Sequence, residues 1–218
     1  MAESHHPSVA EASEAIVRCC RRLWEAGLIA GADGNVSVRV GPETLLVTPR
    51  ELPKSDLVPA DLVRVSLAGT PLGGFRKATR ELDLHLRVYA GRPDVGAVVH
   101  AHPPTATGWG LVGEGLPGDV LPELTVLFGE VPLAPYATPG TPAVGESVAP
   151  FLAGYEGALL AHHGAVTWGS DLAMARTRME SLEHAAEILL AARGLGQVRR
   201  LTPEQLQALP RPRGKPGR

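Results

Sequence analysis

The 218-residue chain has few cysteines, no long apolar run and no signal-peptide pattern, and each of these features would define a class of protein. It has two cysteines, the neighbours Cys19 and Cys20, which are too few for a disulfide framework. No apolar run approaches the ~20 residues that a membrane-spanning helix needs, and the N-terminus lacks the charged-then-apolar pattern of a signal peptide. The sequence therefore predicts a reduced, cytoplasmic protein with no membrane partner.

A strong charge of one sign is also lacking. The formal net charge is −2 and the isoelectric point lies near 6.4, which argues against nucleic acid or an anionic membrane as the partner. The hydrophobic content of 44% is enough for a sizeable core. We expect a flexible leader over residues 1–7, a single domain over 8–209 and a disordered basic tail over 210–218.

Glycine and proline are abundant and divide the chain into short elements. Apolar spacing and cap residues predict helices over 8–30, 80–90, 103–111, 143–153, 171–192 and 201–209, with Thr79 and Asp171 capping two of them. Alternating or continuous apolar runs predict strands over 36–40, 44–48, 61–66, 95–100, 122–128, 131–134, 157–162 and 165–168. Helices interspersed with hairpin-linked strands indicate a layered α/β fold with a mixed or mainly antiparallel sheet.

Two histidines follow the apolar run of residues 95–99, in the motif Val98-Val99-His100-Ala101-His102-Pro103. Since successive side chains of a strand point to opposite faces, His100 and His102 should share one face. Two imidazoles that converge at a strand end supply half of a metal site. Zinc takes three or four such ligands, and a catalytic zinc keeps one position open.

Further nitrogen and carboxylate donors stand where other elements begin or end. Glu81 and His85 lie four residues apart at the start of a predicted helix, on one face of it. His162 and His163 follow another apolar run and would lie on opposite faces of a continuing strand. We predict His163 as the third ligand, because Gly164 lets the backbone turn tightly beside it. His162 is expected to pack against neighbouring residues or to support a metal ligand from outside the site. His85 is expected to orient the ligands rather than to bind the metal.

These motifs, in this order, resemble the class II aldolase/adducin family, whose enzymes include L-fuculose-phosphate aldolase. The resemblance extends from the first helix to about Arg193. It is carried by Gly34-Asn35-Val36-Ser37-Val38-Arg39, Val47-Thr48-Pro49, Glu81-x-x-x-His85, the His100 motif, Ala134-Pro135-Tyr136-Ala137-Thr138-Pro139-Gly140-Thr141 and Leu160-Ala161-His162-His163-Gly164.

The resemblance implies a three-layer α/β fold in which helices flank a central, mainly antiparallel sheet, and usually a four-fold tetramer with active sites at the interfaces. It implies Zn²⁺ held by His100, His102 and His163, with Mn²⁺, Co²⁺ or Fe²⁺ as other possible metals. It also implies Glu81 as catalytic acid/base. The implied activity is that of a lyase, an aldolase cleaving a small hydroxy-ketone such as L-fuculose 1-phosphate. The metal would stabilise the enediolate.

The expected substrate contacts include departures from the family pattern. Gly34 and Asn35 match a loop that helps to hold the substrate phosphate. Arg50-Glu51 stands where phosphate-using aldolases have Thr-Gly or Ser-Gly, and Thr79-Arg80 where they have two serines. Either arginine could bind phosphate or carboxylate through a bidentate contact, or form a surface ion pair.

Two family tyrosines are missing, one near Val126 and one after Tyr155, so no residue is assigned to the proton on the aldehyde side. Other activities on this scaffold therefore stay open, namely a sugar-phosphate epimerase, a dehydratase or a decarboxylase. Epimerases tend to carry Asp where Glu81 stands. A non-catalytic assembly module of the adducin kind is a further alternative, although such relatives lack the metal ligands. The last alternative is a closed structural zinc site with four protein ligands.

Overall fold

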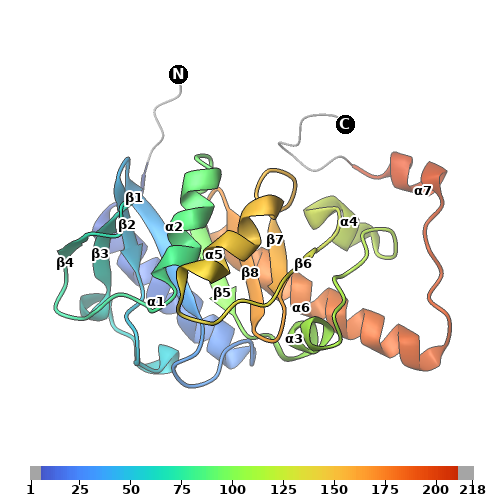
Figure 1. Cartoon of the computed structure of the whole chain (residues 1–218), viewed down its shortest axis with the longest axis horizontal. Helices are drawn as coiled ribbons and strands as arrows, with labels where there is room; N and C mark the ends of the chain where they lie inside the picture. Colours follow the sequence, from blue (N-terminus) through green and yellow to red (C-terminus); the bar gives the residue numbers. More distant parts are fainter. Residues whose placement is uncertain (1–5, 211–218) are drawn as a thin grey trace.

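The computed structural model describes residues 6–210, and one eight-stranded sheet runs through its centre (Figure 1). The strand order is β4-β3-β2-β1-β5-β8-β7-β6, and all neighbours are antiparallel except the parallel pair β6 and β7. The strands are β1 (Asn35–Gly41), β2 (Thr44–Val47), β3 (Val63–Ser66), β4 (Pro71–Gly73), β5 (Ala97–Ala101), β6 (Leu133–Ala134), β7 (Gly157–Leu160) and β8 (Gly164–Gly169).

Helices cover both faces of this sheet, so the predicted three-layer, mainly antiparallel α/β fold is confirmed. One face packs against α1 (Val9–Glu25), α3 (Pro104–Leu111), α4 (Pro122–Phe128) and α6 (Leu172–Leu195). The other packs against α2 (Leu82–Gly91) and α5 (Pro142–Val148), which cross in front of the sheet in Figure 1. The short helix α7 (Pro203–Ala208) follows α6 at the C-terminal end, and the 3-10 turns are Lys54–Asp56, Pro59–Asp61 and Ala149–Phe151.

The alternation of side chains along β5 divides the core into two hydrophobic clusters. Ala97, Val99 and Ala101 belong to the cluster under α1 and α6, whereas Val98 belongs to the cluster under α2 and α5. By the same alternation His100 lies on the α2 side of the sheet, where it is fully buried. The strand thus delivers an imidazole beneath the start of α2.

Several predicted boundaries are wrong. Residues 122–128 form α4 rather than a strand, because Pro122 occupies the first helical turn and the Thr125 hydroxyl donates to the carbonyl of Leu121. The helix predicted from residue 80 begins at Leu82, with Glu81 rather than Thr79 at the N-cap. Strand β7 ends at Leu160 and not at residue 162.

Other expectations are confirmed or lie outside the described part. Asp171 caps α6 by accepting a hydrogen bond from the backbone of Met174. Cys19 and Cys20 are both buried free thiols of α1. Within residues 6–210, no helix is both long and apolar enough to cross a membrane. Residues 1–5 of the predicted leader and 211–218 of the predicted tail lie outside the described residues.

Candidate metal centre

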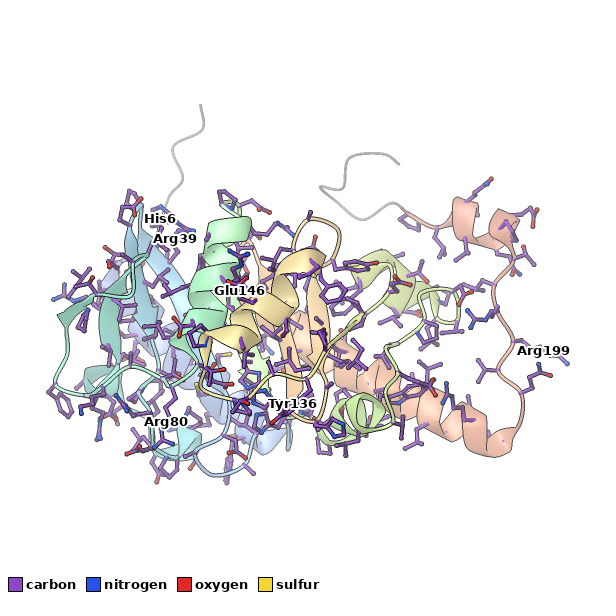
Figure 2. The ribbon with its side chains drawn as sticks, viewed as in Figure 1. His6, Arg39, Arg80, Tyr136, Glu146 and Arg199 are labelled. Atoms are coloured by element: carbon purple, nitrogen blue, oxygen red, sulfur yellow. The ribbon has the colours of Figure 1, made fainter. Side chains whose placement is uncertain are left out.

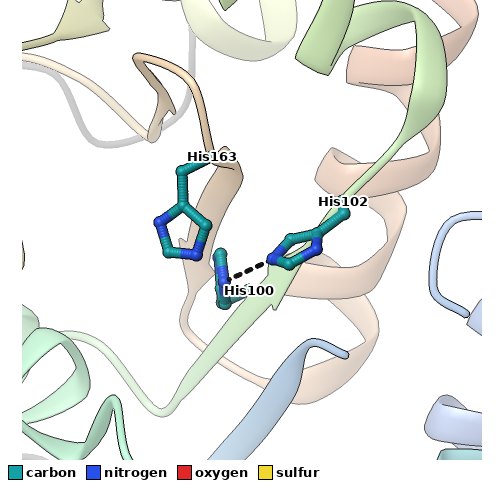
Figure 3. Close-up of side chains that lie close together, drawn as sticks. All are labelled: His100, His102 and His163. Atoms are coloured by element: carbon teal, nitrogen blue, oxygen red, sulfur yellow. Dashed lines mark hydrogen bonds between the residues drawn. The ribbon is translucent and has the colours of Figure 1, made fainter. Parts of the chain in front are cut away.

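Three imidazoles from two strand ends meet at one point (Figure 3). His100 stands on β5, His102 follows that strand, and His163 lies in the turn between β7 and β8. Their ring centroids are 4.7–5.0 Å apart, and each offers a ring nitrogen within 4.8 Å of the others. The pairing of β5 with β8, in which His100 lies opposite Val166, brings these distant segments together.

Two glycines allow this close approach. A side chain at Gly34, whose φ is +67°, would place its Cβ 2.8 Å from the carbonyl oxygen of His100. A Cβ at Gly164 would lie 2.4 Å from the carbonyl oxygen of Ala101. The left-handed residue of the β7–β8 turn is His162, with φ of +58°. Gly164 is therefore needed because a side chain there would collide with Ala101 and His102, and not for the turn that we predicted from the sequence.

The outer nitrogens of two of the rings have partners that orient them. His100 Nδ1 donates a hydrogen bond of 2.9 Å to the carbonyl of Ala165, which leaves its Nε2 lone pair facing the centre. His102 Nδ1 lies 3.6 Å from the Asp33 carboxylate. Asp33 was not among the predicted site residues, and only its position in the Gly31–Gly34 turn could have drawn attention to it.

Glu81 reaches the same centre from the N-cap of α2. Its Oε2 lies 2.9 Å from Nε2 of His100 and accepts a hydrogen bond of 3.0 Å from the Asn35 side-chain amide. Its Oε1 is buried and lies 3.3 Å from Nε2 of His163, with no hydrogen bond among the described residues. A carboxylate oxygen without a hydrogen bond, beside three converging ring nitrogens, is an arrangement that a cation would satisfy.

The electrostatics of this cluster favour one positive charge at its centre. Burial raises the pKa of Glu81, but His100 and then His163 and Asn35 outweigh burial and hold that pKa well below its usual range. Burial lowers the pKa of His100, yet the Glu81 carboxylate outweighs it and the net direction is upward. Burial, followed by the charge of His100, lowers the pKa of His163 to about 4 and also lowers that of His102. The lowered pKa values of His102 and His163 favour the neutral imidazoles that a metal requires as ligands, and the ionised Glu81 carboxylate favours a positive charge beside it.

The residues present fit a divalent metal ion. Two nitrogens bound tetrahedrally to zinc at about 2.05 Å would lie about 3.3 Å apart. Nε2 of His100 and Nε2 of His102 lie 3.2 Å apart. His100, His102 and His163 would be the ligands, with Glu81 beside the position left for substrate. His85 lies outside this group, because its ring nitrogens bond to Ser37 and Asn35.

A cleft of about 310 Å³ opens beside the histidines, which is enough for a small ligand. All five residues predicted to contact substrate line it, namely Gly34, Asn35, Arg50, Thr79 and Arg80. It is also lined by Glu81, His102 and His163, by Glu51 and by Lys54. The last two were not predicted as site residues. Lys54 is 2% exposed and donates hydrogen bonds to the carbonyls of Ala32 and Leu52.

Arg80 stands at the exposed rim of this cleft, where its side chain forms an ion pair with Glu51. The two side chains are 65% and 64% exposed, so the contact is a surface one and either residue is free to exchange partners. Figure 2 shows Arg80 and Tyr136 along the same lower edge of the molecule. Tyr136 does not line the cleft but packs edge-on against His162.

The fold and the site together define a member of the class II aldolase family. Residues 14–190 match the family model described as the class II aldolase and adducin N-terminal domain, and the chain belongs to that family. The motifs read from the sequence therefore identified the family correctly.

Named relatives carry two different activities. The chain is 35% identical over 179 residues to a 3-oxo-tetronate 4-phosphate decarboxylase of Cupriavidus necator, covering 80% of this chain and 82% of that one. It is 31% identical over 198 residues to a 5-deoxy-D-ribulose 1-phosphate aldolase of Bacillus thuringiensis, covering 90% and 92%. A solved L-fuculose 1-phosphate aldolase superposes with a TM-score of 0.86 at 26% identity, covering 95% and 97%.

Proposed function

We propose that this protein is a divalent-metal-dependent lyase that breaks a carbon–carbon bond next to the ketone of a small phosphorylated substrate. The observation that carries the proposal is the convergence of three ring nitrogens and the Glu81 carboxylate on one point of a cleft that arginines border. Zinc is the metal that this donor set suits best, and Mn²⁺, Co²⁺ and Fe²⁺ are alternatives.

The bound metal would supply Lewis-acid polarisation of the substrate ketone, so that the electron pair left by the departing group is accommodated on oxygen. The protein contributes orientation and proton transfer. His100 is fixed by Ala165 and is fully buried, so its ring cannot turn away. Glu81 takes up a proton from solvent in the cleft and delivers it to the carbon that has lost its substituent.

Decarboxylation of a phosphorylated 3-oxo acid is the reaction that we favour. Aldol cleavage requires a second group to take the proton from the hydroxyl that becomes the aldehyde. None of the three tyrosines lines the cleft in the described structure: Tyr89 is buried under the sheet, Tyr136 contacts His162 and Tyr155 donates to Glu130. Loss of carbon dioxide needs no such group. The relatives named as 3-oxo-tetronate 4-phosphate decarboxylases support the same choice.

The cationic side chains also suit a substrate with two anionic groups. Arg50 and Arg80 line the cleft together with Lys54, and guanidinium groups bind carboxylate and phosphate in bidentate fashion. Aldol cleavage of a ketose 1-phosphate is the second candidate. Its support is the similarity to the Bacillus thuringiensis aldolase over 90% of this chain.

Product analysis distinguishes the two reactions. The zinc-loaded protein would be incubated with a four-carbon 3-oxo acid 4-phosphate and, separately, with five- and six-carbon ketose 1-phosphates. We expect carbon dioxide from the first and little aldehyde from the others. Aldehyde release alone would establish the aldolase instead. No turnover of any substrate would refute the proposed function and favour an adducin-like assembly module or a closed structural metal site.

We also propose a homo-oligomer, in keeping with the tetramer that the family resemblance implies, and a cytoplasmic location. Large apolar side chains are exposed near the ends of α3 and α6, among them Leu111, Val112 and Leu190. Exposed apolar side chains that lie together often mark an interface between subunits. Light scattering coupled to size-exclusion chromatography should give a mass about four times that of the 22.9 kDa chain.

A further inference from the structure

A line of four buried polar side chains leads from the middle of the sheet to Glu81. Tyr89 Oη lies 3.0 Å from Ser37 Oγ, and Ser37 Oγ lies 2.6 Å from Nδ1 of His85. Nε2 of His85 lies 2.5 Å from Oδ1 of Asn35, whose amide nitrogen donates to Glu81. These four residues are 0–6% exposed, so the line is shielded from bulk water except at its Asn35 end, which borders the cleft.

The spacing of the two elements explains why the contacts form. His85 and Tyr89 lie four residues apart on α2, a rise of about 6 Å. Asn35 and Ser37 lie two residues apart on β1, a rise of about 6.6 Å, and point to the same face. His85 therefore lies between the two strand side chains, and Tyr89 lies beside Ser37.

The direction of every hydrogen bond follows from the last one. The ionised Glu81 carboxylate only accepts, so the Asn35 amide nitrogen faces it and Oδ1 faces His85. Nε2 of His85 must then carry the proton, which leaves Nδ1 to accept from the Ser37 hydroxyl. The oxygen of Ser37 in turn accepts from Tyr89, whose pKa is raised by burial so that it stays a donor. Reversing the line would set Oδ1 of Asn35 against the carboxylate.

We infer that His85 and Asn35 are positioning residues that hold the Glu81 carboxylate in the orientation from which it transfers protons. Ser37 and Tyr89 fix the His85 tautomer that this requires. The inference rests on the proposed function, because the line of hydrogen bonds is taken to orient Glu81 as the group that transfers protons, and not to orient the metal ligands. It also gives the Asn35 side chain a task besides any contact with phosphate, since one N–H of its amide and its carbonyl oxygen are engaged.

Two variants of His85 separate positioning from packing. His85→Gln retains an N–H that can donate to Asn35, whereas His85→Leu is apolar and suits the buried position better. If His85 positions Glu81, His85→Leu should lower kcat about 10- to 100-fold with KM and metal content changed by less than about twofold. His85→Gln should recover at least part of that loss. Equal activity of the two, or higher activity of His85→Leu, would overturn the inference, as would loss of metal from His85→Leu.

Neutron diffraction from crystals of the deuterated wild-type protein provides a test that needs neither activity nor a variant. We expect deuterium on Nε2 of His85 and none on Nδ1. Deuterium on Nδ1 would overturn the inference even if His85→Leu failed to fold. Deuterium on Nε2 in a protein that turns over none of the substrates would support the hydrogen-bond line while refuting the proposed lyase activity.

Discussion

Glu81 Oε2 lies 2.9 Å from Nε2 of His100, and this contact joins the N-cap of α2 to the end of β5. In the metal-free protein this contact holds the pKa of Glu81 below its usual range and raises the pKa of His100. A divalent ion among the histidines would place positive charge beside Glu81, and Glu81 would then face substrate. The same carboxylate thus has a partner in both states.

Replacing Glu81 by Gln should abolish turnover without emptying the site. The amide keeps the shape and can still lie beside the three imidazoles, but it cannot accept and return a proton. General acid–base catalysis contributes about 10²–10⁴-fold, so kcat should fall by at least that lower value. Steady-state kinetics and metal analysis of the same sample check this. A variant with full metal content and normal turnover would show that another group transfers the proton.

The sequence was sufficient to predict that three histidine rings meet, while their role as metal ligands stays a prediction, and it was not sufficient for the residues around them. Alternation along one strand placed His100 and His102 together, and the motif near His163 supplied the third ring. The hydrogen bonds of Asn35 and His85 depend on how α2 packs over β1, a contact between segments about 50 residues apart that no local pattern encodes. The run over residues 122–128 was ambiguous because short apolar segments suit strands and buried helices equally.

Arg80 should matter for binding the anionic end of the substrate. Arg80→Ala removes a guanidinium from the rim of the cleft, and we expect KM for phosphorylated substrates to rise about tenfold with a smaller change in kcat. Arg87→Ala is the matched control, because Arg87 also forms an exposed ion pair, with Glu146, but does not line the cleft. Equal values of KM in the two variants would remove Arg80 from the substrate contacts.

Glu183 should stabilise the segment that carries His102. This carboxylate on α6 is 6% exposed and accepts hydrogen bonds of 2.8 Å from the backbone N–H groups of Thr105 and Ala106, at the start of α3. Glu183→Ala leaves those groups without their acceptor and should lower the free energy of unfolding by about 2–4 kcal/mol.

Urea denaturation of the metal-free protein measures this loss. The control is Glu187→Ala, one turn further along α6, where the side chain is 57% exposed and lies 3.7 Å from His184. That substitution should change stability by less than about 0.5 kcal/mol. A similar loss in both variants would mean that α6 itself, rather than its contact with α3, is sensitive to the change.

Stability at acidic pH should depend on His85. Burial, with a further contribution from the charge of His100, lowers the pKa of His85 from 6.5 to about 3. Between those values the unfolded chain binds a proton that the folded protein does not, so the free energy of unfolding falls as the pH falls through this window. One proton accounts for a slope of up to about 1.4 kcal/mol per pH unit.

His85→Gln has no such group and should show a shallower dependence. Denaturation of the metal-free proteins between pH 4 and pH 7 compares the two slopes. Parallel profiles would indicate that His85 is protonated in the folded state as readily as in the unfolded chain.

Metal content per chain is the most direct test of the metal centre. Wild-type protein, His100→Ala and His162→Asn would each be loaded with zinc, desalted and analysed by mass spectrometry. His162 is the matched control because it is exposed and stands beside His163, and Asn tolerates its left-handed backbone. We predict one zinc per chain in the wild type and in His162→Asn, and almost none in His100→Ala. Equal zinc in all three proteins would contradict the assignment of His100, His102 and His163 as the metal ligands.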